Sequence, residues 1–166
     1  MNRLLILCVS IMLLSACEVP DEKLFKSIEP SKSNLNFSND LVFDPGFNIF
    51  RYRNYYNGGG VGLIDFNKDG LLDIYMVANM DTNRLFQNLG GLQFKDVTET
   101  AGVGGSHAWS TGVTIADING DGWPDIYVCN SGNVEGDDRR NELFINQGDG
   151  SFTESGRAYG LSLIHI

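Results

Sequence analysis

Apolar and polar positions alternate in short blocks between residues 57 and 160, and the blocks occur twice. Residues 61–77 read VGLIDFNKDGLLDIYMV, and residues 113–128 read VTIADINGDGWPDIYV. Each block has an apolar stretch, an acidic loop and a second apolar stretch, and the two loops align at an offset of 52 residues. Such an internal repeat is typical of solenoids, propellers and arrays, so we expect a repetitive fold.

Each repeat predicts four short strands. In the first repeat we expect them over residues 60–65, 72–78, 85–88 and 93–97. The second stretch is apolar on both faces after its leading aspartate, as expected for a fully buried strand. The later half of the repeat returns at an offset of 58, because NRLFQN at 83–88 is echoed by NELFIN at 141–146. Four strands per repeat predict an all-β, partial β-propeller with about two blades, over 57–108 and 109–160.

The acidic loops carry the candidate chemistry, because both have the spacing D-x-N-x-D-G-x-x-D. Side-chain oxygens at positions one, three, five and nine, with the backbone carbonyl of position seven, form a set of hard donors. Such donors suit calcium or magnesium, and calcium accepts about six to eight of them in flexible geometry. We therefore expect two Ca²⁺ sites, made by Asp65, Asn67, Asp69, Leu71 and Asp73 and by Asp117, Asn119, Asp121, Trp123 and Asp125.

Other readings of these loops fit less well. An EF-hand needs a glutamate at position twelve and a helix on each side. Position twelve is Met76 in the first loop and Val128 in the second, and Pro124 opposes a helix. The remaining alternative is an acidic turn that binds no metal. Two matching loops at the same place in a repeat argue against it, because a chance match would not recur.

The start of the chain predicts export. Arg3 is the only charge before Glu18, and residues 4–14 are an apolar run that leads into LSAC at 14–17. This is the pattern of a secretory signal peptide over residues 1–17. The run is too short to span a bilayer, which needs about 20 apolar residues.

The LSAC segment also resembles the bacterial lipoprotein box. That resemblance implies lipidation of Cys17 and a lipid anchor in the membrane, at the bacterial outer membrane and cell surface. Residues 18–40 are polar and without pattern, so we expect a tether there, followed by the repeat region over 41–160.

Composition narrows the possible partners. The chain has 12 basic and 21 acidic side chains and a formal charge of -9, which disfavours nucleic acid as a partner. Its hydrophobic content of 42% excludes a disordered acidic tail. No pair of carboxylates outside the loops stands out for glycosidase chemistry, so we expect no catalytic residue.

Glycine and tryptophan positions suggest structural roles. The run at 58–62 is rich in glycine but precedes a strand, so we expect close backbone packing near a propeller axis instead of a phosphate site. Trp109 and Trp123 could stack on sugars, but we expect them to pack or to anchor loops.

The repeats resemble the FG-GAP/VCBS repeats of integrin-α-type propellers. The resemblance covers about residues 57–161 and is carried by GGGV before DFNKDGLLDIY, by NRLFQN and FKDVTETAGV, and by WSTGVTIADINGDGWPDIYVCNSG. It looks closest to bacterial ASPIC/UnbV-associated proteins related to cartilage acidic protein. In that family the loop between the first two strands of a blade binds calcium, and the proteins are extracellular and taken to mediate binding or adhesion.

The resemblance implies a calcium-binding extracellular module of a cell-surface lipoprotein with a protein or glycan ligand. Two alternatives stay open, namely a non-catalytic part of a polysaccharide-processing surface enzyme and a purely structural repeat. A closed propeller takes about four to eight blades, more than the two repeats present. Residues 161–166, LSLIHI, leave the pattern and resemble a translated sequencing-library adaptor. We expect a non-native tail there and an N-terminal fragment of a longer chain.

Overall fold

The computed structural model of the protein describes residues 24–105, 109–131 and 140–161. The predicted signal peptide with its lipidation site at Cys17 lies outside these residues, and so do residues 162–166 of the predicted tail. No helix in the part of the chain that the structure describes has the length and apolar character needed to cross a bilayer.

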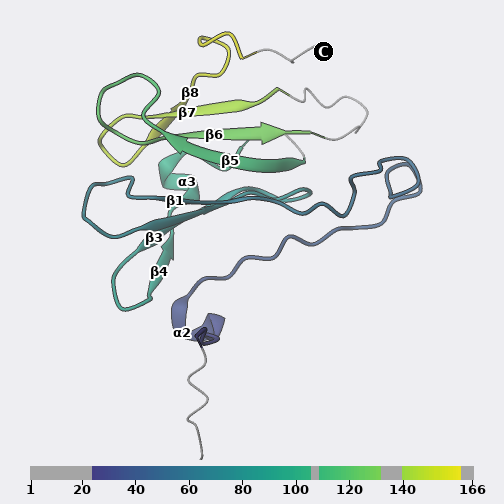
Figure 1. The fold of residues 1–166 in the computed structure, drawn as a ribbon, viewed down its shortest axis with the longest axis horizontal. Helices are drawn as coiled ribbons and strands as arrows, with labels where there is room; N and C mark the ends of the chain where they lie inside the picture. Colours follow the sequence, from purple (N-terminus) through teal and green to yellow (C-terminus); the bar gives the residue numbers. More distant parts are fainter. Residues whose placement is uncertain (1–23, 106–108, 132–139, 162–166) are drawn as a thin grey trace, which may run out of the picture.

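The described fold is two antiparallel four-stranded sheets with two one-turn helices, α2 (Pro30–Ser33) and α3 (Thr98–Ala101). The strands of each sheet follow chain order. The first sheet contains β1 (Val61–Ile64), β2 (Asp73–Met76), β3 (Arg84–Asn88) and β4 (Phe94–Asp96). The second contains β5 (Ser110–Ala116), β6 (Asp125–Asn130), β7 (Glu142–Asn146) and β8 (Phe152–Glu154). The sheets lie one above the other, with α3 on the connection between them (Figure 1). The predicted all-β class and four-strand repeat are confirmed, and the architecture is consistent with partial propeller blades.

The repeat in the sequence is also a repeat in strand register. In the first sheet Val61 pairs with Met76, and in the second Val113 pairs with Val128, each pair shifted by the same 52 residues. The strand expected over 72–78 is shorter in the structure, because side chains form hydrogen bonds with the backbone groups at its ends. The Ala78 N–H donates to Asn83 Oδ1 at 2.9 Å instead of continuing the ladder.

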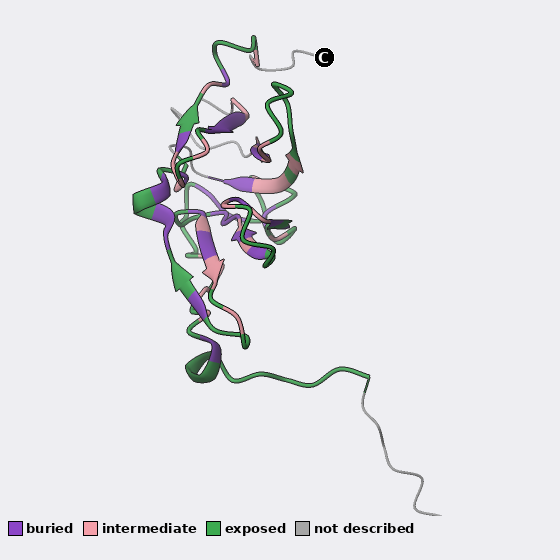
Figure 2. Cartoon of the chain, turned by 90° about the vertical axis from the view of Figure 1, so that its left-hand side faces the viewer, coloured by how far each residue is buried: buried purple, intermediate pink, exposed green. Residues whose placement is uncertain are grey.

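One hydrophobic cluster joins the two sheets. Its first-sheet members are buried side chains of β1, β2 and β3, and Val113 and Ile115 of β5 pack against it. Tyr75 is completely buried at its centre and donates its hydroxyl to the Val103 carbonyl at 2.6 Å. Burial raises the pKa of Tyr75 well above its ordinary value, so the hydroxyl stays a neutral donor. Figure 2 shows buried residues gathered where the sheets face each other, whereas the segment leading into α2 is exposed.

The glycine run lies where the inner strands β1 and β5 approach each other. A Cβ on Gly60 would lie 3.1 Å from Gly112 Cα, and one on Gly62 would lie 3.2 Å from the Ile115 side chain. The expected close packing at this run is confirmed. Larger side chains here would push the two sheets apart, so the glycines set how closely the sheets pack.

The segment expected to be a tether makes contacts with the first sheet. Gln93, in the turn before β4, donates its side-chain amide to the Lys32 carbonyl. At the other end of the sheet, Asn39 Nδ2 donates to Asn79 Oδ1 at 2.8 Å. The part of this segment between Lys32 and Asn39 therefore runs along the sheet.

A small aromatic cluster follows this segment and covers one end of the second sheet. Phe47, Tyr52 and Tyr55 surround Trp109, whose side chain is 1% exposed. The expectation that Trp109 packs is confirmed. Its indole N–H has no hydrogen-bond partner among the residues that the structure describes.

The glycine packing gives a direct test of the fold. A Cβ on Gly59 would lie 2.1 Å from the Val77 carbonyl oxygen, so Gly59→Ala must displace backbone. We expect a loss of roughly 1–3 kcal/mol in the free energy of unfolding, measured by urea denaturation. Gly112→Ala is the control, because its Cβ would make an ordinary 3.7 Å contact with Cys129. Equal midpoints for the two variants would contradict the close packing.

Candidate metal-binding loops

The two acidic loops occupy equivalent places, one between β1 and β2 and the other between β5 and β6. Each loop turns through left-handed backbone at two equivalent positions. Gly70 has φ of 85° and Gly122 has φ of 87°, values that favour glycine. Two residues earlier, Lys68 and Gly120 also have positive φ. The D-G step in each motif therefore supplies the sharp turn that wraps the loop.

In the first loop the carboxylates hold the loop's own backbone. Asp65 accepts the N–H groups of Asp69 and Gly70, both at 3.0 Å. Asp69 accepts the N–H of Leu71 at 2.8 Å and the side-chain amide of Asn67 at 2.8 Å. Four of the five predicted ligand residues thus form one compact turn, in which Leu71 contributes its backbone.

The second loop repeats these four hydrogen bonds and adds one, from the Gly120 N–H to Asp117 at 2.8 Å. Asp117 accepts the N–H groups of Asp121 at 3.2 Å and Gly122 at 2.8 Å. Asp121 accepts the N–H of Trp123 at 2.7 Å and the side-chain amide of Asn119 at 2.7 Å. The same residue types at the same spacing therefore build the same loop twice.

The ninth residue of each motif plays a different part, because its side chain is completely buried. Asp73 accepts the N–H of Phe66 at 3.2 Å and that of Asn88 at 2.7 Å. It thereby ties the loop to the end of β3. In the second sheet Asp125 accepts the N–H groups of Ile118 and Asn146, both at 2.9 Å, and so ties its loop to the end of β7.

Asn88 and Asn146 are loop-supporting residues that the sequence analysis missed. Besides their backbone N–H groups, both use their side chains to brace the loop. Asn88 Nδ2 donates to the Leu72 carbonyl at 2.9 Å, and Asn146 Nδ2 donates to the Pro124 carbonyl at 3.2 Å. The signal was present, because the two asparagines recur at an offset of 58, but a repeated asparagine alone does not reveal its partner.

The carboxylates of the first loop lie close enough to affect one another. Burial raises the pKa of Asp73, its two backbone hydrogen bonds oppose that shift, and the charges of Asp69 and Asp65 raise it further. The exposed Asp121 differs. The Trp123 N–H, the Asn119 side chain and the Lys68 charge hold the pKa of Asp121 below its ordinary value.

Lys68 connects the two loops. Its ammonium lies 4.0 Å from the centre of the Trp123 ring, a cation–π contact between position four of the first loop and position seven of the second. The indole also lies against the turn between β7 and β8, where a Cβ on Gly148 would lie 3.0 Å from the ring. Trp123 therefore anchors a loop, as predicted.

The donor chemistry of the loops fits a hard cation. Each loop offers three aspartates and an asparagine oxygen, the ligand types that calcium prefers. Among the residues that the structure describes, no three His, Cys, Asp or Glu side chains form a cluster with metal-ligating geometry. The reason lies in the hydrogen bonds, because the loop carboxylates face backbone amides. Asp69 and Asp121 are exposed, so they can turn toward a cation without unburying apolar surface.

A groove of about 380 Å³ lies between the sheets beside the first loop. Its lining comes from both sheets and is mostly polar, with one cation and one carboxylate. The lining residues are Phe66, Asn67, Gln87, Lys95, Val97, Thr100, Asp149, Gly150 and Ser151. Because Asn67 belongs to the first loop, the shape of the groove depends on that loop.

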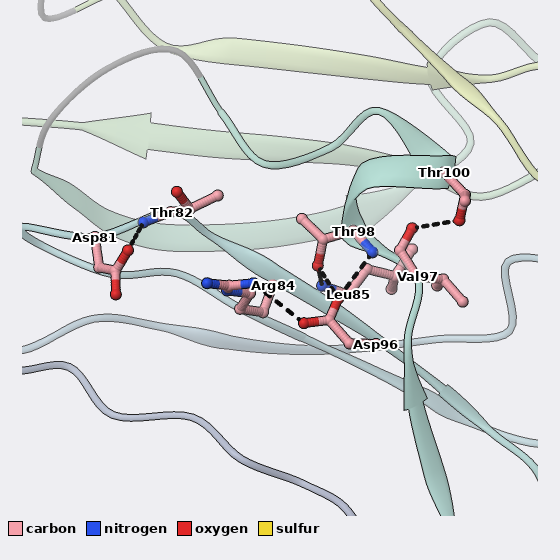
Figure 3. Close-up of polar contacts among 8 residues, drawn as sticks. All are labelled: Asp81, Thr82, Arg84, Leu85, Asp96, Val97, Thr98 and Thr100. Carbon is pink, nitrogen blue, oxygen red and sulfur yellow. Dashed lines mark hydrogen bonds and ion pairs between the residues drawn. The ribbon is translucent and has the colours of Figure 1, made fainter.

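A polar cluster braces the outer edge of the first sheet (Figure 3). It lies next to a second hollow of about 300 Å³. Arg84 on β3 and Asp96 on β4 form an ion pair at 3.2 Å. Asp96 also accepts the hydroxyl of Thr98 at 2.6 Å and its N–H at 3.0 Å. The Thr98 hydroxyl oxygen in turn accepts the Leu85 N–H at 2.9 Å. The cluster therefore fixes the start of α3 on the sheet.

Comparison with known proteins agrees with the repeat. Residues 65–128 match the FG-GAP-like repeat family. The match runs from the first aspartate of one loop to Val128 within β6 and so contains both acidic loops. It supports the FG-GAP repeat family that the sequence resembles. No curated protein matches the chain.

The Asp96 cluster predicts a pH-dependent stability. Burial alone would raise the pKa of Asp96, but the Thr98 hydrogen bonds and the Arg84 charge hold it below its ordinary value. The stabilisation is therefore complete above the unfolded pKa of about 3.9 and is lost as the pH falls through the folded pKa. We expect Asp96→Asn to lose up to about 1 kcal/mol at neutral pH, because the pair is partly exposed.

Urea unfolding of the wild type and Asp96→Asn between acidic and neutral pH measures this. The two stabilities should converge as the pH falls from the unfolded pKa of about 3.9 through the lower folded pKa of Asp96, because the wild-type carboxylate becomes protonated there. Glu99→Gln on α3 is the control, because it makes the same change of charge beside the same hollow. A constant difference between wild type and Asp96→Asn at all pH values would contradict this prediction.

Proposed function

We propose that this chain is a calcium-binding extracellular repeat module of a cell-surface lipoprotein and that it binds a protein or glycan ligand. The repeat itself rests on the match at residues 65–128. The finer resemblance to bacterial ASPIC/UnbV-associated proteins rests on the sequence motifs. The lipid anchor at Cys17 and the place at the bacterial outer membrane rest on the pattern of residues 1–17.

The observation that supports calcium binding most strongly is the set of equivalent hydrogen bonds that the two loops share. A surface turn that served only to connect strands could vary in sequence between repeats. Here Asp65 and Asp117 accept equivalent pairs of N–H groups, and Asp69 and Asp121 accept equivalent amides. Three carboxylates per loop repel one another unless a cation lies among them. Because both loops keep this unfavourable repulsion, we expect both to bind the same kind of cation.

Each loop residue would contribute a different ligand to the cation. Asp65, Asn67 and Asp69 would bind it with side-chain oxygens, Leu71 with its carbonyl, and Asp73 would close the shell. The second loop would use its five equivalents. Calcium, when bound, supplies positive charge that offsets the repulsion of the carboxylates. Asp73 and Asp125 already hold each loop against the next strands, so little backbone needs to be ordered on binding.

The groove between the sheets supports the ligand-binding part of the proposal. Amide, hydroxyl and charged groups line it, including Gln87, Lys95 and Ser151. Such donors and acceptors suit a polar surface such as a glycan or a peptide backbone. Because Asn67 forms part of the lining, calcium in the first loop would fix one wall of the groove.

The proposal predicts two calcium sites per chain, and a mutation in either loop should leave one. We expect isothermal titration calorimetry to show two sites, with dissociation constants of about 10⁻⁴–10⁻³ M as in other extracellular modules. Asp69→Ala and Asp121→Ala should each leave one site, because each removes a ligand that the other loop cannot replace. Calcium should also raise the melting temperature, since it binds the folded state only.

Asp149→Ala is the matched control, because it removes an exposed aspartate from a turn outside both loops. It should keep two sites. A melting temperature that is the same in millimolar calcium and in chelator, with no heat of binding, would reject calcium binding.

The ligand proposal predicts that binding depends on calcium. The wild-type protein is tested for binding to panels of immobilised glycans and extracellular matrix proteins. It should bind at least one of them in the presence of calcium, and this binding should disappear in chelator. The Asp69→Ala and Asp121→Ala double variant should lose the same ligand. If the wild type binds calcium but no member of the panels, the structural alternative is favoured over a binding module.

A further inference from the structure

The groove beside the first acidic loop has walls from both described sheets. One wall is formed by β3 and β4, and the other by the turn between β7 and β8. On the first wall Gln87 and Lys95 are direct partners across the two strands, so their side chains share a face of the sheet. Leu85, two residues before Gln87 on the same face, is completely buried in the cluster that joins the sheets. The groove is therefore the outer end of the contact between the sheets.

The fold does not use the two polar side chains on this wall. Among the residues that the structure describes, neither Gln87 nor Lys95 has a side-chain hydrogen bond or an ion pair. In the second sheet the same cross-strand pair is Ile145 and Thr153. The second repeat keeps its register with these residues, so strand pairing does not require an amide and an ammonium here. Both groups are free to bind a ligand.

The opposite wall adds a carboxylate, which its own turn holds in place. The hydroxyl and the N–H of Ser151 both donate to Asp149 Oδ1, at 2.6 Å and 2.9 Å. These bonds hold the pKa of Asp149 below its ordinary value, so the carboxyl group is ionised at neutral pH. The equivalent position of the first repeat is Gly91. The groove thus combines a cation from one sheet with a carboxylate from the other, and neither charge recurs in the other repeat.

Two apolar side chains complete the lining. Phe66 is 4% exposed and Val97 is 8% exposed, so each adds a small apolar surface to the groove. The ring of Phe66 lies 6.2 Å from the ring of Phe152 on β8, which fixes it between the two sheets. Small-ligand sites typically combine such apolar surface with a few placed polar groups. A ligand with an apolar face and polar edges therefore fits this groove, and sugar rings have that form.

We propose that this groove binds a short stretch of an uncharged glycan. The inference rests on the proposed function and names the class of its ligand. Sugar hydroxyls both donate and accept hydrogen bonds, so they can accept from Gln87 and Lys95 and donate to Asp149. The groove volume of about 380 Å³ lies at the small end of the range for ligand sites, roughly 300–1,000 Å³. That size suits a short saccharide.

Charge and geometry argue against two other classes of ligand. The carboxylate of Asp149 balances the ammonium of Lys95, and the acidic first loop adjoins the groove through Asn67. An anionic glycan would therefore meet repulsion as well as attraction. A peptide that binds by strand addition needs a free sheet edge, whereas Gln87 and Lys95 project from the face of two strands that pair with each other.

Isothermal titration calorimetry of the full chain in millimolar calcium tests the proposal. The probes are neutral gluco-, manno- and xylo-oligosaccharides, with an oligogalacturonate and a collagen peptide for comparison, and the wild type should bind a neutral probe. Lys95→Thr and Gln87→Ile place the second repeat's own residues in the first, so both variants should fold and keep both calcium sites. Lys95→Thr should weaken binding about tenfold or more, because a charged hydrogen-bond donor is lost, and Gln87→Ile should weaken it by a smaller factor.

Thr153→Lys is the matched control. It places an ammonium at the equivalent exposed position of β8, outside the groove, so it should bind the probe like the wild type. Circular dichroism melts check that each variant folds.

Three outcomes would overturn the inference. Binding of a neutral probe that Lys95→Thr and Gln87→Ile both leave unchanged would exclude the groove as the site. Binding of the oligogalacturonate or the peptide alone would exclude the ligand class, although the chain would still be a binding module. A wild type that binds two calcium ions and none of the probes would overturn the inference and leave calcium binding intact. Calcium uptake does not depend on Lys95 or Gln87, so a failure of the proposed calcium sites is detected separately.

Discussion

The buried carboxylate at the ninth loop position is the interaction on which the rest of the structure depends. Asp73 and Asp125 each accept one N–H from the loop that precedes them and one from the third strand of their sheet. Hydrogen bonds to a charged group contribute about 1.5–3 kcal/mol, and a buried carboxylate without them would be strongly unfavourable. Each aspartate therefore couples loop shape to strand pairing, so a sheet cannot form correctly with its loop in another conformation.

A second constraint acts between the sheets, where backbone approaches backbone. Gly60 faces Gly112, and Gly62 receives the side chains of the neighbouring inner strand. At this distance the loops of the two sheets come into reach of each other, and Lys68 lies over the indole of Trp123. Asn146 adds a direct link by donating its side chain to the Phe66 carbonyl at 2.9 Å. The glycine positions therefore allow both the close approach of the inner strands and the contact between the two loops.

Much of the fold and of the acidic loops could be predicted, because the same sequence pattern occurs in both repeats. The strand pattern, the four-strand unit and the acidic loops all follow from short segments whose partners lie nearby in the chain. The role of Asn88 could not be read in this way, because it depends on a contact with Asp73 across the sheet. Nor could the place of α3 on the sheet, because Thr98 at its start accepts the N–H of Leu85 from β3. Contacts between distant residues are the part that local pattern does not encode.

The repeat also explains why its two copies have unequal surroundings. Identical positions need identical neighbours to be equally buried, and a linear stack of two sheets cannot give them. Ile126 is completely buried, whereas its counterpart Ile74 is only half-buried, although the two occupy the same register in their sheets. The difference in burial thus comes from position in the stack and not from residue type. A sequence that keeps an apolar residue at both places is therefore suited to a neighbouring sheet on either side.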